Sequence, residues 1–189
     1  MTKYEEHTVD MPIGYGGYES YDSSSMRSVR SEAIQEFGFA IMTDAAAELI
    51  AAFSPILEVG AGSGYWTWEL QAIGADAVAT DPDPFSCVGC EVDREWVEVE
   101  RLNADQAMEL YPGRTVLSVW PSLGDTWLDD ALRVHKPERL VLVGEGAYGC
   151  TASPALWDAL DELGYAEVST FDLPQWSGIH DYGAVYELK

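Results

Sequence analysis

Basic residues are scarce in this chain: 10 lysines and arginines stand against 33 aspartates and glutamates, and lysine occurs only at Lys3, Lys136 and Lys189. The net charge of −23 repels the phosphate backbone of nucleic acids at ordinary ionic strength, which argues against DNA or RNA as a partner. The acids are scattered rather than gathered in a tail. Because molar salt shortens the Debye length to about 3 Å, this composition predicts a halophilic, salt-adapted protein. A very acidic protein from a low-salt cell is the alternative.

Residues that bind metals are also few, with three cysteines and three histidines. An odd number of cysteines argues against a disulfide framework. Cys87 and Cys90 have the spacing of one half of a zinc ribbon, but no second C-x-x-C pair exists and the histidines are far away in sequence. Free thiols in a loop are therefore favoured over a structural metal, and we expect no metal.

Long apolar runs are absent as well. No run reaches the roughly 20 residues that a membrane span needs. The first residues, Met1 to Glu6, lack the charged and apolar regions of a signal peptide. We therefore expect no membrane partner and a cytoplasmic location. A chain of 189 residues fits one domain with a sizeable core.

The most informative stretch runs from Ile56 to Trp66. A short apolar run contains Glu58 and is followed by glycines at Gly60, Gly62 and Gly64. This pattern predicts a buried strand that turns tightly into a helix, whose N-terminus offers unpaired N–H groups. The dinucleotide fingerprint places its last glycine one residue later, so the spacing argues against a nicotinamide cofactor. A glycine turn without a ligand is the alternative.

The rest of the chain alternates between strands and helices. We expect strands at residues 56–59, 77–81, 96–102, 115–120, 139–144, 167–173 and 183–188, and helices at 26–37, 43–53, 65–73, 106–110, 125–135 and 153–163. The alternation predicts an α/β fold with a parallel sheet covered by helices on both faces. The short elements after the sixth strand suggest that the last strand returns antiparallel.

Asp81 ends the second strand about 20 residues beyond the first glycines, where an acid can accept hydrogen bonds from both ribose hydroxyls. A solvated aspartate at a strand end is the alternative. Residues 1–25, rich in tyrosine, glycine and serine, show no period and form either a flexible tail or a lid over a ligand. Residues 26–189 are predicted to form a single domain.

Several segments, in chain order, carry a resemblance to a known family. They are Glu58–Trp66, Ala79–Pro82, Val119–Pro121, Gly144–Glu145 with Gly149–Ala152, and Pro174–Trp176 with Gly178–Asp181. Together they resemble a family of class I S-adenosylmethionine (SAM) methyltransferase-like proteins with E-x-G-x-G-x-G, W-P-P-like, G-E…G-C-T and P-Q-W-x-G-I-H-D segments. The likeness covers about residues 36–189.

The resemblance implies a Rossmann-like sheet of seven strands in the order 3-2-1-4-5-7-6, with the last strand antiparallel, and SAM as the cofactor. It also implies that an acid after the third strand meets the adenine amino group. The residues expected to bind the cofactor are Glu58, Gly60, Ala61, Gly62, Gly64, Asp81, Pro82, Asn103, Ala104, Asp105 and Trp120.

The sequence departs from related patterns in ways that bear on the methyl acceptor. The fourth strand ends in Trp120-Pro121-Ser122, which lacks the Asp or Asn that amino-methylating DNA enzymes place before Pro-Pro. With the charge of −23, this argues against DNA methylation. We expect the acceptor to contact Pro121, Ser122 and Trp176. Trp120 and Trp176 either line the acceptor pocket or are aromatic residues of the core.

A base is needed only if the acceptor must lose a proton. The candidates are Glu145, His180 and Asp181, and His180 titrates nearest neutrality. His180 can equally be a loop histidine bonded to backbone. Cys150 is either a nucleophile or, as its size favours, a small buried residue.

Three functions remain open from the sequence. The first is a SAM-dependent methyltransferase acting on a small molecule or a protein side chain. The second is a non-catalytic protein with the same fold that binds the cofactor or a partner without turnover. A nicotinamide enzyme is the third and is disfavoured by the glycine spacing. The sequence leaves the oligomeric state open.

Overall fold

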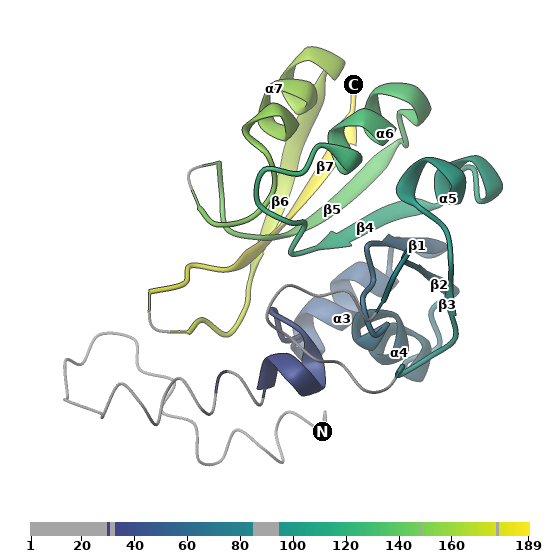
Figure 1. The fold of residues 1–189 in the computed structure, drawn as a ribbon, viewed down its shortest axis with the longest axis vertical. Coiled ribbons are helices and arrows are strands. Elements are labelled where there is room, and N and C mark those ends of the chain that lie inside the picture. The colour runs from purple at the N-terminus through teal and green to yellow at the C-terminus, as the bar shows by residue number, and fades with distance from the viewer. Residues whose placement is uncertain (1–29, 31–32, 85–94, 148, 177) are drawn as a thin grey trace.

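The structure is a computed structural model that describes residues 30, 33–84, 95–147, 149–176 and 178–189 (Figure 1). The N-terminal segment 1–25, the Cys87–Cys90 pair and most of the predicted helix before residue 33 lie outside this range. Residues 33–37, the end of that predicted helix, are helical.

Seven strands form one sheet in the order β3-β2-β1-β4-β5-β7-β6. The strands are β1 (Ile56–Val59), β2 (Ala77–Thr80), β3 (Val99–Glu100), β4 (Thr115–Val119), β5 (Arg139–Gly144), β6 (Tyr165–Asp172) and β7 (Tyr182–Leu188). The first five pair in parallel, whereas β7 runs antiparallel to both β5 and β6. This arrangement confirms the predicted fold and strand order.

Helices cover both faces of the sheet (Figure 1). The helices α3 (Asp44–Ala51) and α4 (Tyr65–Ala72) pack on one face, where Ile56, Leu117 and Val141 point toward them. The helices α5 (Ala104–Leu110), α6 (Trp127–His135) and α7 (Pro154–Leu163) pack on the other face, against Leu57 and Leu140. The central strands are buried on both sides, which explains why they read as continuous apolar runs.

The helix ends follow the capping residues in the sequence. The Thr43 hydroxyl accepts a hydrogen bond from the Ala46 N–H at 3.1 Å, and Ser153 does the same for the Leu156 N–H at 3.1 Å. Pro154 occupies the first turn of α7 and Gly164 ends it with a φ of 85°. These are the start and stop signals that helices prefer.

Several elements differ from the sequence prediction at their ends. β6 begins at Tyr165 and α6 at Trp127, each two residues from the predicted start, and α3 ends at Ala51 instead of residue 53. β3 pairs over only two residues. Before it, the Trp96 N–H donates to the Ser63 carbonyl at 2.8 Å; after it, β2 has ended at Thr80 and the Leu102 N–H turns back to the Glu100 carbonyl at 2.8 Å. α5 begins at Ala104 rather than at residue 106, because Asn103 caps it and exchanges hydrogen bonds with Gln106. That exchange is a capping box with glutamine in the third helical position.

The topology brings several chain segments to one edge of the sheet. The parallel strands β1, β2, β4 and β5 all end there. β7 starts there, since Tyr182 pairs with Gly144 at the end of β5. The strand order reverses between β1 and β4, the position at which open α/β sheets bind ligands.

Candidate active site

The loop after β1 has three glycines in left-handed conformations, and they differ in what surrounds them. A Cβ on Gly60 would lie 3.0 Å from the Trp127 ring, and one on Gly64 would lie 2.7 Å from the Val97 side chain. Those two glycines are therefore explained by packing. Gly62, with a φ of 53°, has nothing within 4 Å of its Cβ position. Its open side is where another molecule can approach the main chain closely.

Asp81 joins this loop to the end of β2. Its Oδ2 accepts a hydrogen bond from the Gly62 N–H at 2.9 Å, and its Oδ1 accepts one from the Asp83 N–H at 2.8 Å. Ala61 adds a backbone bond from its N–H to the Thr80 carbonyl at 3.0 Å. Each carboxylate oxygen keeps a second acceptor position, so the half-buried Asp81 can still receive hydroxyl donors. Pro82 follows it and is exposed.

Glu58, in β1, is buried and bonded to the first turn of α4. Its carboxylate is fully buried and accepts hydrogen bonds from the Thr67 N–H at 2.9 Å and the Thr67 hydroxyl at 2.6 Å. Burial raises the pKa of Glu58 to about 7, although the bonds from Thr67 oppose that shift. In this position Glu58 fixes the start of α4 against β1.

We expect the Glu58→Gln variant to gain stability over the wild type as the pH rises. The pKa of Glu58 is about 7 in the folded protein against an ordinary value of 4.5. The folded state therefore holds this proton more tightly than the unfolded state, and the stability that the proton provides is full below pH 4.5 and is lost as the pH rises through 7. Glutamine keeps the acceptor oxygen but never ionises, so the gap in unfolding free energy should widen by about 3 kcal/mol between those limits. Urea unfolding at several pH values measures it, with the exposed Glu48→Gln as control. A gap that stays constant with pH would contradict the burial argument.

The residues after β3 are engaged with neighbouring helices. The Asn103 side chain caps α5 by accepting from the Gln106 N–H at 2.9 Å, and Ala104 is buried. The exposed Asp105 carboxylate lies 2.8 Å from Nε2 of His135, at the end of α6. An adenine contact by Asp105 remains a prediction, and it would share this carboxylate with His135.

Trp120, directly after β4, is held in an uncommon conformation. Its φ is 52°, in the left-handed region that a bulky residue rarely adopts. Its N–H donates to the Val143 carbonyl at 2.8 Å, and its ring stacks on Phe39 at 4.8 Å with an interplanar angle of 12°. Its indole Nε1–H donates to Oδ1 of Asp181 at 2.9 Å. Such a residue persists only where several contacts hold it, and such positions cluster at functional sites.

Glu145, after β5, ties two loops together. Its Oε2 accepts from the Cys150 N–H at 2.7 Å and its Oε1 accepts from the His180 N–H at 2.9 Å, across 35 positions of chain. Hydrogen bonds from the thiol and the N–H of Cys150 lower the pKa of Glu145 to about 2. We call this arrangement of Glu145, Cys150 and His180 the Glu145 clamp.

The other members of the clamp differ in their surroundings. Burial, and then the hydrogen bond to Glu145, raise the pKa of the Cys150 thiol to about 11, which removes the thiolate that a nucleophile needs. The His180 side chain is 79% exposed, and its Nδ1 lies 3.5 Å from Oε1 of Glu145.

Three predicted acceptor contacts surround this edge. The buried Pro121 accepts a hydrogen bond at its carbonyl from the Ala152 N–H at 2.7 Å, which joins the loop after β4 to the loop after β5. Ser122 is exposed. Trp176 is half-buried and packs on the same core cluster as Trp120.

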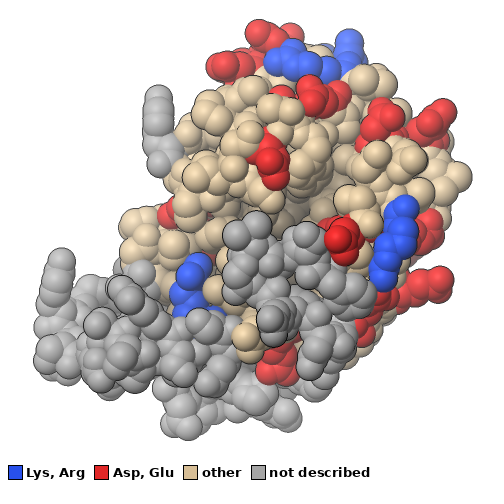
Figure 2. Space-filling model, viewed as in Figure 1, with Lys and Arg blue, Asp and Glu red and all other residues tan. Residues whose placement is uncertain are grey.

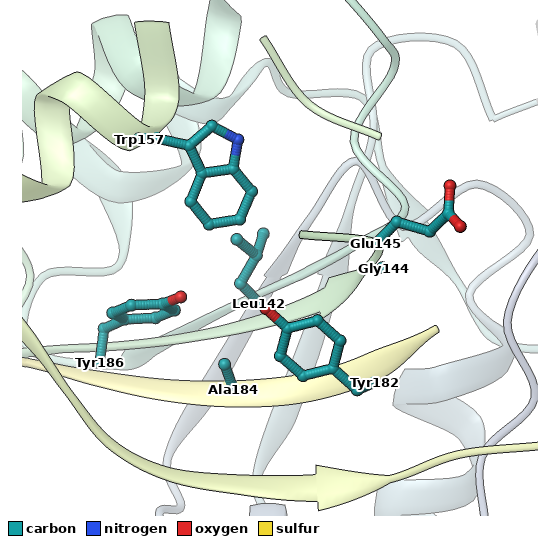
Figure 3. A pocket seen from close by; sticks show the side chains of 7 residues that line it. All are labelled: Leu142, Gly144, Glu145, Trp157, Tyr182, Ala184 and Tyr186. Carbon is teal, nitrogen blue, oxygen red and sulfur yellow. The ribbon is translucent and has the colours of Figure 1, made fainter. Parts of the chain in front are cut away.

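A small cavity lies beside this region, under α7. It has about 160 Å³ of empty space, including space open to solvent, and its lining includes Leu142, Trp157, Tyr182 and Tyr186. Figure 3 shows the Glu145 carboxylate directed away from the Trp157 and Tyr186 rings. Glu145 thus lines the cavity at its edge, with its carboxylate pointing out of it (Figure 3).

Two aromatic residues in the site escaped the sequence reasoning. Trp127 covers Gly60, and Phe39 stacks on Trp120. Phe39 lies within the stretch that the family resemblance covers, but no role in the site was predicted for it. Trp127 offered no signal beyond its place in a predicted helix.

The surface fits the charge of the sequence. Figure 2 shows acidic side chains at several separate places on one face, with fewer basic ones among them. Several arginines are paired with acids, including Arg114 with Asp76 at 2.8 Å and Arg133 with Glu162 at 2.6 Å. Within the described residues, no group of three or more potential ligands could hold a metal ion, and no helix has the length and apolarity to cross a bilayer.

Comparison with known proteins identifies the fold. No protein-family model and no curated protein matches the chain. Among solved structures, the magnesium protoporphyrin IX methyltransferase of Synechocystis with bound SAM has a TM-score of 0.52 at 12% identity, over 100% of this chain and 92% of that one. The CcbJ methyltransferase of Streptomyces caelestis has a TM-score of 0.51 at 15% identity, over 76% and 94%. A candidate tRNA (m1A22) methyltransferase of Streptococcus pneumoniae has a TM-score of 0.52 at 18% identity, over 78% of this chain and 71% of that one.

The chain has the class I SAM-dependent methyltransferase fold. At these identities the likeness establishes the architecture and leaves the reaction to be argued from the site.

Proposed function

We propose that this protein is a SAM-dependent methyltransferase that acts on a small molecule or a protein side chain and is adapted to high salt. The observation that carries the proposal is Gly62. It is the glycine of its loop with open space at the Cβ position, and its N–H is held by Asp81, the acid expected at the ribose. A residue that must be glycine but touches nothing suits a loop against which a ligand lies.

The residues of this edge fit the cofactor's parts. The loop from Gly60 to Gly64 would hold the amino-acid portion beside the start of α4, and Asp81 would receive the ribose hydroxyls. Bound SAM supplies an activated methyl group, so the protein's main contribution is to bind and orient the acceptor. The acceptor would lie where the loops after β4 and β5 meet the start of β7.

The charge of the surface supports a compact acceptor. The net charge of −23 disfavours a nucleic acid, even though one protein of similar fold is a candidate tRNA methyltransferase. The aromatic side chains of Trp120 and Trp176 suit contact with a small molecule or a single side chain better than with a duplex.

We expect Asp81→Ala to weaken binding of SAM and S-adenosylhomocysteine by about 1–3 kcal/mol, because two hydroxyls lose a charged acceptor. Titration calorimetry in molar KCl measures the dissociation constants. Asp83→Ala is the matched control, since it removes an equal charge two positions away. Asp81→Asn separates charge from shape by keeping one acceptor oxygen. Equal affinity in Asp81→Ala and Asp83→Ala would show the ribose assignment to be wrong.

A protein that binds the cofactor without turnover is the second candidate. It is favoured by the Glu145 clamp, in which a predicted catalytic carboxylate is occupied by two backbone N–H groups. Binding without methyl transfer to any acceptor would favour this candidate, and binding of NAD instead would contradict both.

A further inference from the structure

The two oxygens of Asp181 differ in their environments. Oδ1 accepts the indole N–H of Trp120 at 2.9 Å, whereas Oδ2 is buried and has no hydrogen-bond partner among the described residues. The residue as a whole is only 1% exposed. A buried carboxylate oxygen without a hydrogen-bond partner is destabilising, so its presence in a folded protein calls for an explanation.

The charges around Asp181 come from three segments. Burial raises its pKa to about 6, the bond from Trp120 opposes that shift, and among the charges Glu145 raises the pKa while Arg30 and His180 lower it. The Cys150 thiol also lies within electrostatic reach. Asp181 is thus largely ionised at neutral pH and remains a much better proton acceptor than an ordinary aspartate. A group with a pKa near the working pH is the most effective general base.

The competing bases at this edge are less suitable. Glu145 has both oxygens occupied and a pKa of about 2, so it holds a proton poorly. Cys150 is held as a thiol by a pKa of about 11. His180 projects into solvent, with 79% of its side chain exposed. Asp181 combines burial, a fixed orientation and a free oxygen.

We propose that Oδ2 of Asp181 takes up the proton that the methyl acceptor releases, and that the natural acceptor is therefore a compact compound whose reacting atom is an N–H or O–H. This inference rests on the proposed methyltransferase function and specifies its substrate class. The acceptor's nitrogen or oxygen forms a bond to the methyl carbon as the carbon–sulfur bond breaks, and the electron pair of that bond stays on sulfur. The acceptor's hydrogen leaves as a proton and ends on Asp181, so charge and atoms balance.

Trp120 serves this proposal as a positioning residue. Its ring is fixed by Phe39, its backbone by Val143, and its indole N–H occupies Oδ1. The carboxylate therefore cannot rotate freely, and Oδ2 is the oxygen left for the acceptor.

The first test needs no acceptor. The indole N–H of Trp120 reports directly on the ionisation of its partner, and heteronuclear NMR of protein with isotope-labelled tryptophan resolves the seven indole signals. Trp120→Phe identifies the signal. We expect it to titrate with a midpoint near pH 6, to stop titrating in Asp181→Asn and to keep the wild-type midpoint in Asp158→Asn, which makes the same chemical change at an exposed position of α7. A signal that does not titrate between about pH 5 and 8 would overturn the proposal.

The second test measures transfer from tritiated SAM, in molar KCl, to compact amines, phenols and imidazoles. Each is paired with its fully methylated analogue, which has the same shape but no hydrogen on the reacting atom. Transfer should occur only to the protic member of a pair. Asp181→Asn should lower kcat by about 10²–10⁴-fold, and the same change at an exposed position, Asp158→Asn on α7, should change it by less than about threefold. Asparagine preserves the bond to Trp120 and the size of the side chain, so the affinity for S-adenosylhomocysteine should stay within about twofold.

The outcomes separate this inference from the function on which it rests. If S-adenosylhomocysteine does not bind, the proposed function fails and the inference fails with it. If it binds but transfer goes to an analogue without hydrogen, or to no protic compound, or if Asp181→Asn turns over at the wild-type rate, the inference is overturned and the cofactor assignment stands.

Discussion

Raising the KCl concentration from about 0.1 M to about 1 M is expected to raise the melting temperature by roughly 10–20 °C. A charge of −23 on a sphere of about 20 Å radius, the size expected for this chain length, repels itself by about 50 kcal/mol in pure water. Screening reduces this to roughly 18 kcal/mol at about 0.1 M salt and roughly 7 kcal/mol at about 1 M. Salt also reduces the repulsion within the unfolded chain. The net increase in the free energy of unfolding is therefore on the order of 5 kcal/mol.

The measurement is a series of thermal melts from low to molar KCl. A triple variant, Glu48→Lys, Glu109→Lys and Asp158→Lys, changes three exposed acids and moves the net charge from −23 to −17, two charges per substitution. Its melting temperature should depend less on KCl than that of the wild type, which distinguishes screening from other effects of salt. A wild-type melting temperature that stays flat over the series would rule out the salt-adaptation proposal.

Gly149→Ala is expected to lower the free energy of unfolding by about 3–5 kcal/mol. A Cβ at residue 149 would lie 2.1 Å from the Cβ of Glu145 and 2.9 Å from its Oε2. Because the nearer atom is attached directly to the main chain, the backbone must shift to admit the methyl group. That shift breaks the Glu145 clamp and leaves the N–H groups of Cys150 and His180 without their acceptor.

Urea unfolding in molar KCl measures the free energy of unfolding of each variant. Urea is uncharged, so it does not change the ionic strength. Gly146→Ala is the matched control, because its Cβ would lie 3.3 Å from the Tyr182 hydroxyl, the far end of a side chain that can move. We expect this control to lose about 1 kcal/mol or less. Equal stability of the two alanine variants would show that the clamp contributes little to the fold.

The sequence was most informative where local rules act alone. The bounds of β1 and β5 were predicted as they occur, because each is an apolar run with a clear end. α7 was also predicted well, since Ser153, Pro154 and Gly164 mark its two ends. β3 was predicted too long. Its alternating pattern extends beyond the paired residues on both sides, and non-local contacts limit the pairing: the Trp96 N–H donates to the Ser63 carbonyl before β3, and β2 ends at Thr80.

The geometry of the site depended on contacts that no local pattern encodes. Trp120 and Asp181 are 61 positions apart, yet they share a hydrogen bond. Glu145 was a candidate base by residue type, and only its two backbone partners show it to be a clamp. The free oxygen of Asp181 likewise depends on which other groups surround it in three dimensions. Sequence reasoning could assemble the candidates, but it could not rank them.

The place of β7 in the sheet has a consequence for how the protein is made. β7 follows every other strand in the chain but lies between β5 and β6. During synthesis, β5 and β6 are therefore complete while the strand that joins them is still missing, and each exposes an unpaired edge. Such long-range pairing slows folding, because distant segments lose chain entropy in meeting before their contacts can stabilise them. Asp181 directly precedes β7, so its carboxylate reaches Trp120 only at the step that closes the sheet, and the acceptor site proposed above cannot be complete in the nascent chain before then.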